Sequence, residues 1–104
     1  MGKIYTIDEI KSIVNPIARA HKVDRIYLFG SYARGEATIS SDIDLRVDKG
    51  RLKGLIALGA LYADLEGGLG KKVDLVTTGS LDQSFLQRIS GEEVLIYASE
   101  RPGC

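Results

Sequence analysis

The chain has 104 residues, 44% hydrophobic and 27% charged, which is the composition of one ordinary globular domain. Its 14 basic residues balance its 14 acidic residues, so net charge gives no basis for direct binding to nucleic acid. No apolar run approaches the ~20 residues that cross a bilayer, and the N-terminus lacks the apolar core of a signal peptide. We therefore expect one cytoplasmic domain over residues 1–104, with an ordered core at about 7–97 and no membrane association. Cys104 is the only cysteine, which excludes an internal disulfide or a thiolate metal site.

The N-terminal segment predicts a capped helix. Thr6 and Glu9 have the spacing of a capping box, in which each side chain bonds the backbone amide of the other residue. Apolar residues then recur at helical spacing as far as His21. Pro16 lies within this stretch and lacks an amide hydrogen, which predicts a kink or two short helices. His21, the only histidine, is expected at the solvated helix end without a partner.

The rest of the chain alternates between predicted strands and helices. These are a buried central strand at 25–29, a short helix at 31–35, a strand at 42–48, a helix at 52–69, a strand at 72–77, a helix at 81–90 and a strand at 94–97. The order predicts an α/β (α+β) fold, a small mixed sheet with helices packed on it. Because residues 36–41 are too few for a helical crossover, the first two strands are either antiparallel neighbours or separated in the sheet.

The longest predicted helix, at 52–69, is expected to be amphipathic. Gly54 and Gly59 each weaken it by about 1 kcal/mol relative to alanine. We therefore expect both glycines where another backbone packs close.

Two aspartates on the second predicted strand carry the main chemical signal. Polar and apolar residues alternate from Asp42 onward, so Asp42 and Asp44 project from the same face of the strand. Two carboxylates held together repel unless a proton or a cation intervenes. Since the ligands are oxygens, the pair predicts a site for a hard metal ion. Arg46 shares the face and is expected to soften the repulsion, and Asp48 to lie at a solvated strand end.

A Gly-Ser turn precedes these aspartates. The segment from Gly30 to Gly35 lacks the lysine and the hydroxyl of a P-loop, and it does not match the Rossmann fingerprint. Gly30 would let a phosphate approach the backbone, and Ser31 would donate its hydroxyl and amide to that phosphate at the start of a helix. Magnesium held by Asp42 and Asp44 would then bridge the phosphates.

A longer pattern joins the two features. Gly30-Ser31, ten further residues and Asp42-Ile43-Asp44 form the signature Gly-Ser-x10-Asp-x-Asp, within the surrounding text LFGSYARGE and SDIDL. The sequence thereby resembles the minimal nucleotidyltransferase (MNT) domains of the polymerase-β superfamily. The resemblance spans about residues 7–97. Asp74, between apolar residues in KVDLV, fits the third acid that this family carries on a neighbouring strand.

The resemblance implies a polymerase-β-like fold and a role for each of these residues. Asp42, Asp44 and Asp74 would hold two Mg²⁺ ions, and Asp74 would help to deprotonate the attacking hydroxyl. The phosphates of ATP, the substrate, would be bound by Gly30, Ser31 and Arg34. Attack in line on the α-phosphate would release pyrophosphate. The alternative for Arg34 is a surface pair with Glu36 or Asp48.

Free-standing domains of this size resemble the antitoxin half of HEPN–MNT toxin–antitoxin pairs. The resemblance implies AMP transfer from ATP to a tyrosine hydroxyl of a HEPN ribonuclease toxin, which silences the toxin. For the chain itself, a homo- or hetero-oligomer is expected. Two alternatives stay open: a small-molecule acceptor, as in aminoglycoside nucleotidyltransferases, and a non-catalytic antitoxin that acts by binding alone. The apolar helix around residues 55–65 and the glycine-rich segment after it are candidate contact surfaces.

Overall fold

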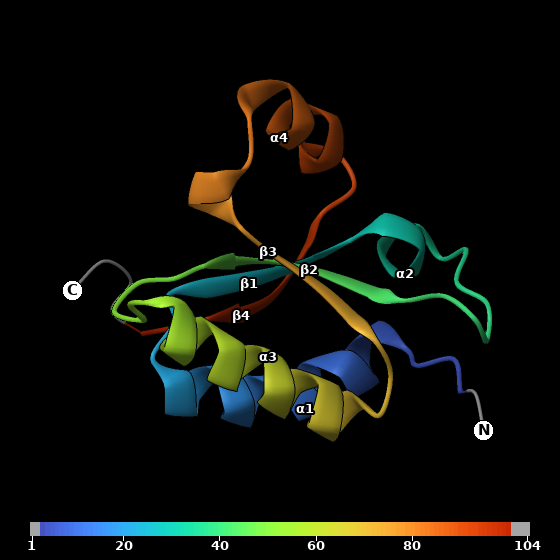
Figure 1. Cartoon of the computed structure of the whole chain (residues 1–104). Helices are drawn as coiled ribbons and strands as arrows, with labels where there is room; N and C mark the ends of the chain where they lie inside the picture. The colour runs from blue at the N-terminus through green and yellow to red at the C-terminus, as the bar shows by residue number, and fades with distance from the viewer. Residues whose placement is uncertain (1–2, 101–104) are drawn as a thin grey trace.

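Residues 3–100 are described by the structure, a computed structural model (Figure 1). The tail that carries Cys104 lies outside them. The elements, in chain order, are α1 (Ile7–His21), β1 (Arg25–Phe29), α2 (Gly30–Arg34), β2 (Ile43–Asp48), α3 (Leu55–Leu69), β3 (Val73–Thr77), the 3-10 turn η1 (Thr78–Ser80), α4 (Gln83–Ser90) and β4 (Val94–Ala98). Every predicted element between residues 7 and 97 is present, with boundaries shifted by a few residues.

The four strands form one mixed sheet in the order β3-β2-β1-β4. β1 runs antiparallel to both of its neighbours, β2 and β4, which confirms that it is a central strand. Of the two arrangements left open for the first two strands, antiparallel neighbours is therefore the one observed. β2 and β3 are parallel, and α3 forms the crossover that such a pair requires.

The helices cover the two faces of the sheet unequally. Figure 1 shows α1 and α3 on one face and α4 on the other, with α2 beside the end of β1. The core lies under α1 and α3, where Ile43, Leu45 and Val47 of β2 are fully buried. Leu28 of β1 pairs with Leu45 and is equally buried. The face of the sheet toward α4 is thus left for polar side chains.

Helix α1 begins at the predicted capping box and continues through its proline. The Glu9 amide donates to the Thr6 hydroxyl at 3.1 Å, and the Thr6 amide donates to the Glu9 carboxylate at 2.9 Å. The expected break into two short helices does not occur, because α1 is one helix across Pro16. Val14 and Ala18, on either side of the proline, are both buried against the core, and this shared burial holds the helix together.

His21, at the end of α1, has a partner that the sequence did not suggest. Its Nε2 is 2.7 Å from Oδ2 of Asp64 on α3, and its side chain is 17% exposed. The expected solvated, unpartnered histidine is therefore wrong. The partner lies 43 residues away in sequence, and only the packing of α1 against α3 brings it into contact.

Helix α3 begins later than predicted and differs from a regular amphipathic helix. Its C-terminal part buries Leu61, Leu65 and Leu69, as expected. In its first turn, however, Leu55 and Ile56 are 85% and 91% exposed.

No helix in the described part of the chain combines the length and apolar character needed to span a bilayer.

The close approach expected at two glycines of this region is found at a third. A Cβ added at Gly54 or Gly59 would meet nothing within 4 Å. The expectation is wrong at both positions. A Cβ added at Gly68 would lie 2.9 Å from Cδ1 of Ile17 and 3.2 Å from Cγ2 of Ile13. Gly68 therefore sets how closely α3 approaches α1.

We predict opposite effects for leucine at two adjacent glycines. Gly68→Leu should destabilise the protein by about 1–2 kcal/mol, because it overpacks the contact between α3 and α1. Gly67→Leu, at an exposed position with no neighbour within 4 Å, should stabilise α3 by about 0.5–1 kcal/mol through helix propensity. Urea denaturation of both variants measures the difference. Equal effects of the two substitutions would contradict this view of the helix contact.

Candidate active site

The polar face of β2 lies on the side of the sheet toward α4. Burial alternates along the strand, with Asp44 and Arg46 partly exposed between fully buried apolar residues. This confirms the predicted alternation. Asp42 directly precedes the strand, in the same alternating pattern.

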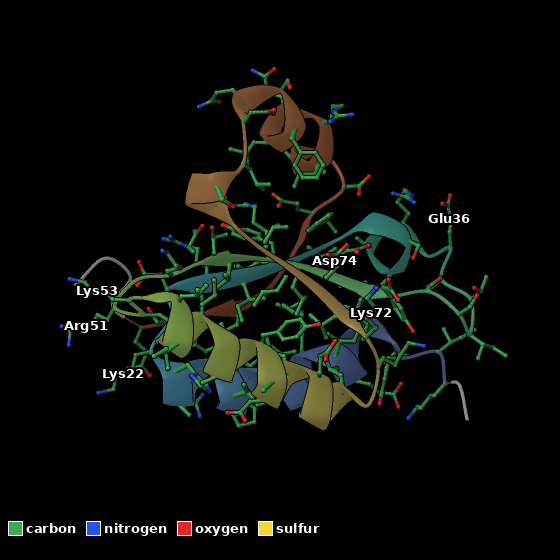
Figure 2. The ribbon with its side chains drawn as sticks, viewed as in Figure 1. Lys22, Glu36, Arg51, Lys53, Lys72 and Asp74 are labelled. Atoms are coloured by element: carbon green, nitrogen blue, oxygen red, sulfur yellow. The ribbon has the colours of Figure 1, made fainter. Side chains whose placement is uncertain are left out.

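The sheet brings the three predicted carboxylates together. Asp44 and Asp74 are direct register partners on the parallel strands β2 and β3. Asp74 on β3 is exposed, and Figure 2 labels it together with Lys72, which lies just before the strand begins. Burial, and after it the nearby charges of Asp74 and Asp42, raise the pKa of Asp44 to about 6. The three acids therefore interact electrostatically, with Asp44 at their centre.

The Gly-Ser turn lies directly against this cluster. Gly30 starts α2 with φ of 75°, in the left-handed region that favours glycine. A Cβ at this position would lie 2.0 Å from Oδ2 of Asp44, so a larger residue would displace the carboxylate. Ser31, the next residue, is partly buried in the first turn of α2. The turn and the carboxylate are thus in van der Waals contact.

A fourth acid, Glu92, completes this site. The Gly30 amide donates to Oε2 of Glu92 at 2.8 Å, and Arg34 Nη1 lies 3.3 Å from both Glu92 oxygens. Arg34 also donates from Nε to Glu36 at 2.9 Å, as one of its alternatives predicted. Hydrogen bonds to Glu36 and Glu92 raise the pKa of Arg34. Glu92 carries no motif and lies about 60 residues from its partners, so only the fold reveals it.

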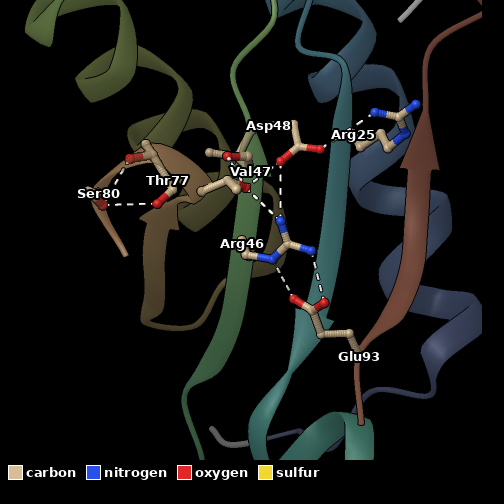
Figure 3. A network of polar contacts seen from close by, with 8 residues as sticks. Arg25, Arg46, Val47, Asp48, Thr77, Ser80 and Glu93 are labelled. Carbon is tan, nitrogen blue, oxygen red and sulfur yellow. Dashed lines mark hydrogen bonds and ion pairs between the residues drawn. The ribbon is translucent and has the colours of Figure 1, made fainter. Parts of the chain in front are cut away.

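Arg46 belongs to a separate network further along the same face (Figure 3). Its guanidinium donates to Glu93 at 2.9 Å from Nη2 and to Asp48 at 3.2 Å from Nη1. It also stacks 4.2 Å above the Tyr27 ring, and its side chain is 11% exposed. Arg46 is therefore held by Glu93 and Asp48, and its expected effect on the carboxylate repulsion stays a prediction. The charge of Arg34 lowers the pKa of Asp44, against the larger effects of burial and of the neighbouring acids.

Asp48 differs from its expected role. Its carboxylate accepts from Arg46, pairs with Arg25 at 3.6 Å and accepts the hydroxyl of Thr78. The side chain is 25% exposed. Asp48 is thus a partly buried member of the Arg46 network, and the predicted solvated strand end is wrong.

Comparison with known proteins identifies the family. The model of the polymerase β nucleotidyltransferase domain matches residues 11–102. The chain belongs to this family. A Methanocaldococcus jannaschii relative assigned as a protein adenylyltransferase is 44% identical over 88 residues, 85% of this chain and 95% of its own. The protein adenylyltransferase MntA of Thermococcus cleftensis is 37% identical over 99 residues, 88% of this chain and 96% of its own.

Solved structures of toxin–antitoxin complexes share the fold of this nucleotidyltransferase. A toxin–antitoxin structure with AMP-PNP has a TM-score of 0.73 and 28% identity, and the match covers 86% of this chain and 74% of that one. The complex of tri-AMPylated Shewanella oneidensis HEPN toxin with MNT antitoxin has a TM-score of 0.68 and 25% identity, with 90% and 74% covered. The predicted polymerase-β-like mixed sheet with packed helices is confirmed.

The carboxylates of this nucleotidyltransferase fit a divalent cation by their chemistry. They supply the hard oxygen ligands that Mg²⁺ prefers, and their mutual repulsion is what a cation would remove. Because Gly30 has no side chain, the Asp44 carboxylate can lie directly against the turn. Among residues 3–100, no three acidic, histidine or cysteine side chains already converge on one ion-sized position.

The raised pKa of Asp44 predicts a pH-dependent stability of the metal-free nucleotidyltransferase. The folded pKa of about 6 exceeds the ordinary value of 3.8, so ionisation of Asp44 opposes folding. Stability from this group is present below about pH 4 and is lost as the pH rises through about 6. Asp44→Asn should therefore raise the Tm by a few degrees at about pH 8 and leave it unchanged at about pH 4. Scanning calorimetry in EDTA checks this, and a variant that melts lower at both pH values would contradict it.

The Arg46 network predicts a large loss of stability when one partner is removed. Glu93→Ala leaves the largely buried Arg46 guanidinium without its main partner and should cost about 3 kcal/mol. Glu36→Ala breaks an exposed pair with Arg34 and should change the stability little, because solvent screens such a pair. Urea unfolding of the two variants compares them. Similar values for both would mean that the Arg46 pair contributes no more than a surface pair.

Proposed function

We propose that this nucleotidyltransferase is a Mg²⁺-dependent protein adenylyltransferase and antitoxin. It transfers AMP from ATP to a tyrosine hydroxyl of a HEPN ribonuclease toxin and so neutralises the toxin. The observation that carries the proposal is the contact between the Gly30 turn and the Asp44 carboxylate, with Asp74 in register beside it. A phosphate-binding turn and metal-binding carboxylates must adjoin for attack on a nucleotide phosphate.

In this proposal the acids and the turn divide the work. Asp42, Asp44 and Asp74 would hold two Mg²⁺ ions, which supply charge stabilisation at the reacting phosphate when bound. The amide of Gly30 and the hydroxyl of Ser31 orient the phosphates of ATP. Both the amide and the hydroxyl act through position and charge, which provide most of the acceleration in phosphoryl transfer.

The transfer itself makes one bond and breaks one. The acceptor oxygen forms a bond to the α-phosphorus, while the bond from that phosphorus to the bridging oxygen breaks and pyrophosphate leaves. Asp74 is exposed at the open edge of the cluster and takes the proton of the acceptor hydroxyl. Arg34, on the surface beside the turn, neutralises the charge that develops on the leaving pyrophosphate.

The assignment of the partner depends on the relatives and on the surface of the chain. Several of the solved neighbours are toxin–antitoxin complexes, one of them with an AMPylated HEPN toxin. The side chains of Leu55 and Ile56 are almost fully exposed on α3, which suits a contact surface for such a partner in the cytoplasm. The balanced net charge gives no support for direct nucleic-acid binding. A small-molecule acceptor and neutralisation by binding alone are the alternatives that the experiment below separates.

We predict that AMP transfer requires the aspartate pair. The partner toxin is co-expressed with the wild-type chain, with Asp42→Asn/Asp44→Asn, and with Asp8→Asn as a matched control on the exposed surface of α1. Intact-mass spectrometry should find one or more AMP units on the toxin with wild type and Asp8→Asn. The double variant should reduce the transfer by about a hundredfold or more, and EDTA should do the same in vitro.

Two other outcomes would redirect the assignment. A toxin of unchanged mass that still co-purifies with every variant would replace the enzymatic antitoxin with one that acts by binding. An unmodified toxin together with pyrophosphate release on a small acceptor would favour the transferase of small molecules.

A further inference from the structure

Glu92 accepts hydrogen bonds from groups that, in the proposed function, bind the phosphates of the nucleotide. It lies in the short turn between α4 and β4, and its carboxylate accepts the Gly30 amide at 2.8 Å. Both of its oxygens also lie 3.3 Å from Nη1 of Arg34. Gly30 and Arg34 are two of the three groups expected to bind phosphate. An anionic side chain of the protein itself thus holds both of them.

Glu92 and a triphosphate cannot both accept the single hydrogen of the Gly30 amide, and they compete for the charge of Arg34. A backbone amide has one hydrogen, and a carboxylate oxygen and a phosphate oxygen are both anionic acceptors for it. The charge of Glu92 also adds to the negative potential around Asp44, where it acts in the same direction as Asp74 and Asp42. A triphosphate that entered beside Glu92 would meet this charge as well.

The fold holds Glu92 at the site through the adjacent residue. Glu93 is 8% exposed and forms a paired ion contact with Arg46. On the other side of the turn, Phe85 of α4 packs edge-on against Phe29, with ring centroids 6.0 Å apart. Phe29 directly precedes Gly30. The turn that carries Glu92 is therefore anchored on both sides, close to the residue that Glu92 contacts.

We propose that Glu92 is an internal competitor of the triphosphate and so determines the affinity of the site for nucleotide. The inference rests on the proposed function, because it assumes that Gly30 and Arg34 bind phosphate. When the triphosphate binds, Glu92 releases the Gly30 amide and Arg34, and phosphate oxygens replace its carboxylate. The side chain then turns away from the site, while Glu93 remains paired with Arg46.

Calorimetric titration of the whole chain tests the competition. The probes are Mg-ATP, Mg-tripolyphosphate, which lacks the base and sugar, and adenosine, which lacks the phosphates. Glu92→Ala removes the competing acceptor and should tighten binding of both phosphate probes about tenfold. Glu92→Gln keeps a neutral oxygen that accepts the Gly30 amide, so binding of both phosphate probes should tighten only about threefold. Adenosine binding should not change in either variant.

Glu36→Gln is the matched control. Glu36 also accepts a hydrogen bond from Arg34 but does not contact Gly30, and its side chain is 66% exposed. It should change the Kd of tripolyphosphate less than Glu92→Gln does. An equal effect of the two variants would overturn the role of the Gly30 amide and leave only charge near Arg34.

The NMR signal of the Gly30 amide tests the contact without any nucleotide. Its chemical shift should differ between wild type and Glu92→Gln before ligand is added, and it should move in wild type on addition of tripolyphosphate. An identical Gly30 shift in both proteins would overturn the inference and leave the proposed function intact. Binding of Mg-ATP that is unchanged or weaker in Glu92→Ala would do the same. Absence of Mg-ATP binding in every variant would overturn the proposed function as well.

Discussion

The missing side chain at Gly30 is the constraint on which the whole site depends. Only glycine combines easy access to φ of 75° with the space that the Asp44 carboxylate fills, since a Cβ would lie 2.0 Å from Oδ2. The antiparallel pairing of β1 with β2 sets Phe29 opposite Asp44 and so fixes the turn beside the acid. The glycine that the backbone angle requires thereby also brings the turn into contact with the carboxylate cluster.

The polar face of the sheet separates its charges into two groups. Toward the end of β2, Arg46 is committed to Glu93 and Asp48, and Arg25 also pairs with Asp48. Both arginines therefore form ion pairs within this network. Near the start of the strand, Asp44 keeps a pKa of about 6 because burial and neighbouring acids outweigh the influence of Arg34. The separation preserves the negative charge of the acidic cluster, which a closer arginine would have neutralised.

Local patterns predicted much of the fold and of the candidate site. Alternation from Asp42 identified a strand with one polar face, and the Thr6–Glu9 spacing identified the helix start. Contacts between distant segments were not predictable in this way. The partner of His21 and the neighbours of Gly68 depend on how α1 packs against α3, and no local pattern encodes that packing. Glu92 was missed for the same reason.

Two consecutive acids before β4 contact the two separate charge groups on the polar face of the sheet. Glu93 is largely buried with Arg46 in the network of Asp48, whereas Glu92 accepts a hydrogen bond from the turn that adjoins Asp44. Removal of a buried partner is costly, so Glu93 is the fixed member of the pair. Glu92 is one quarter exposed, and its partners can exchange it for another anion without exposing the core. The same turn can therefore remain attached to the sheet through one acid while the other responds to what occupies the site.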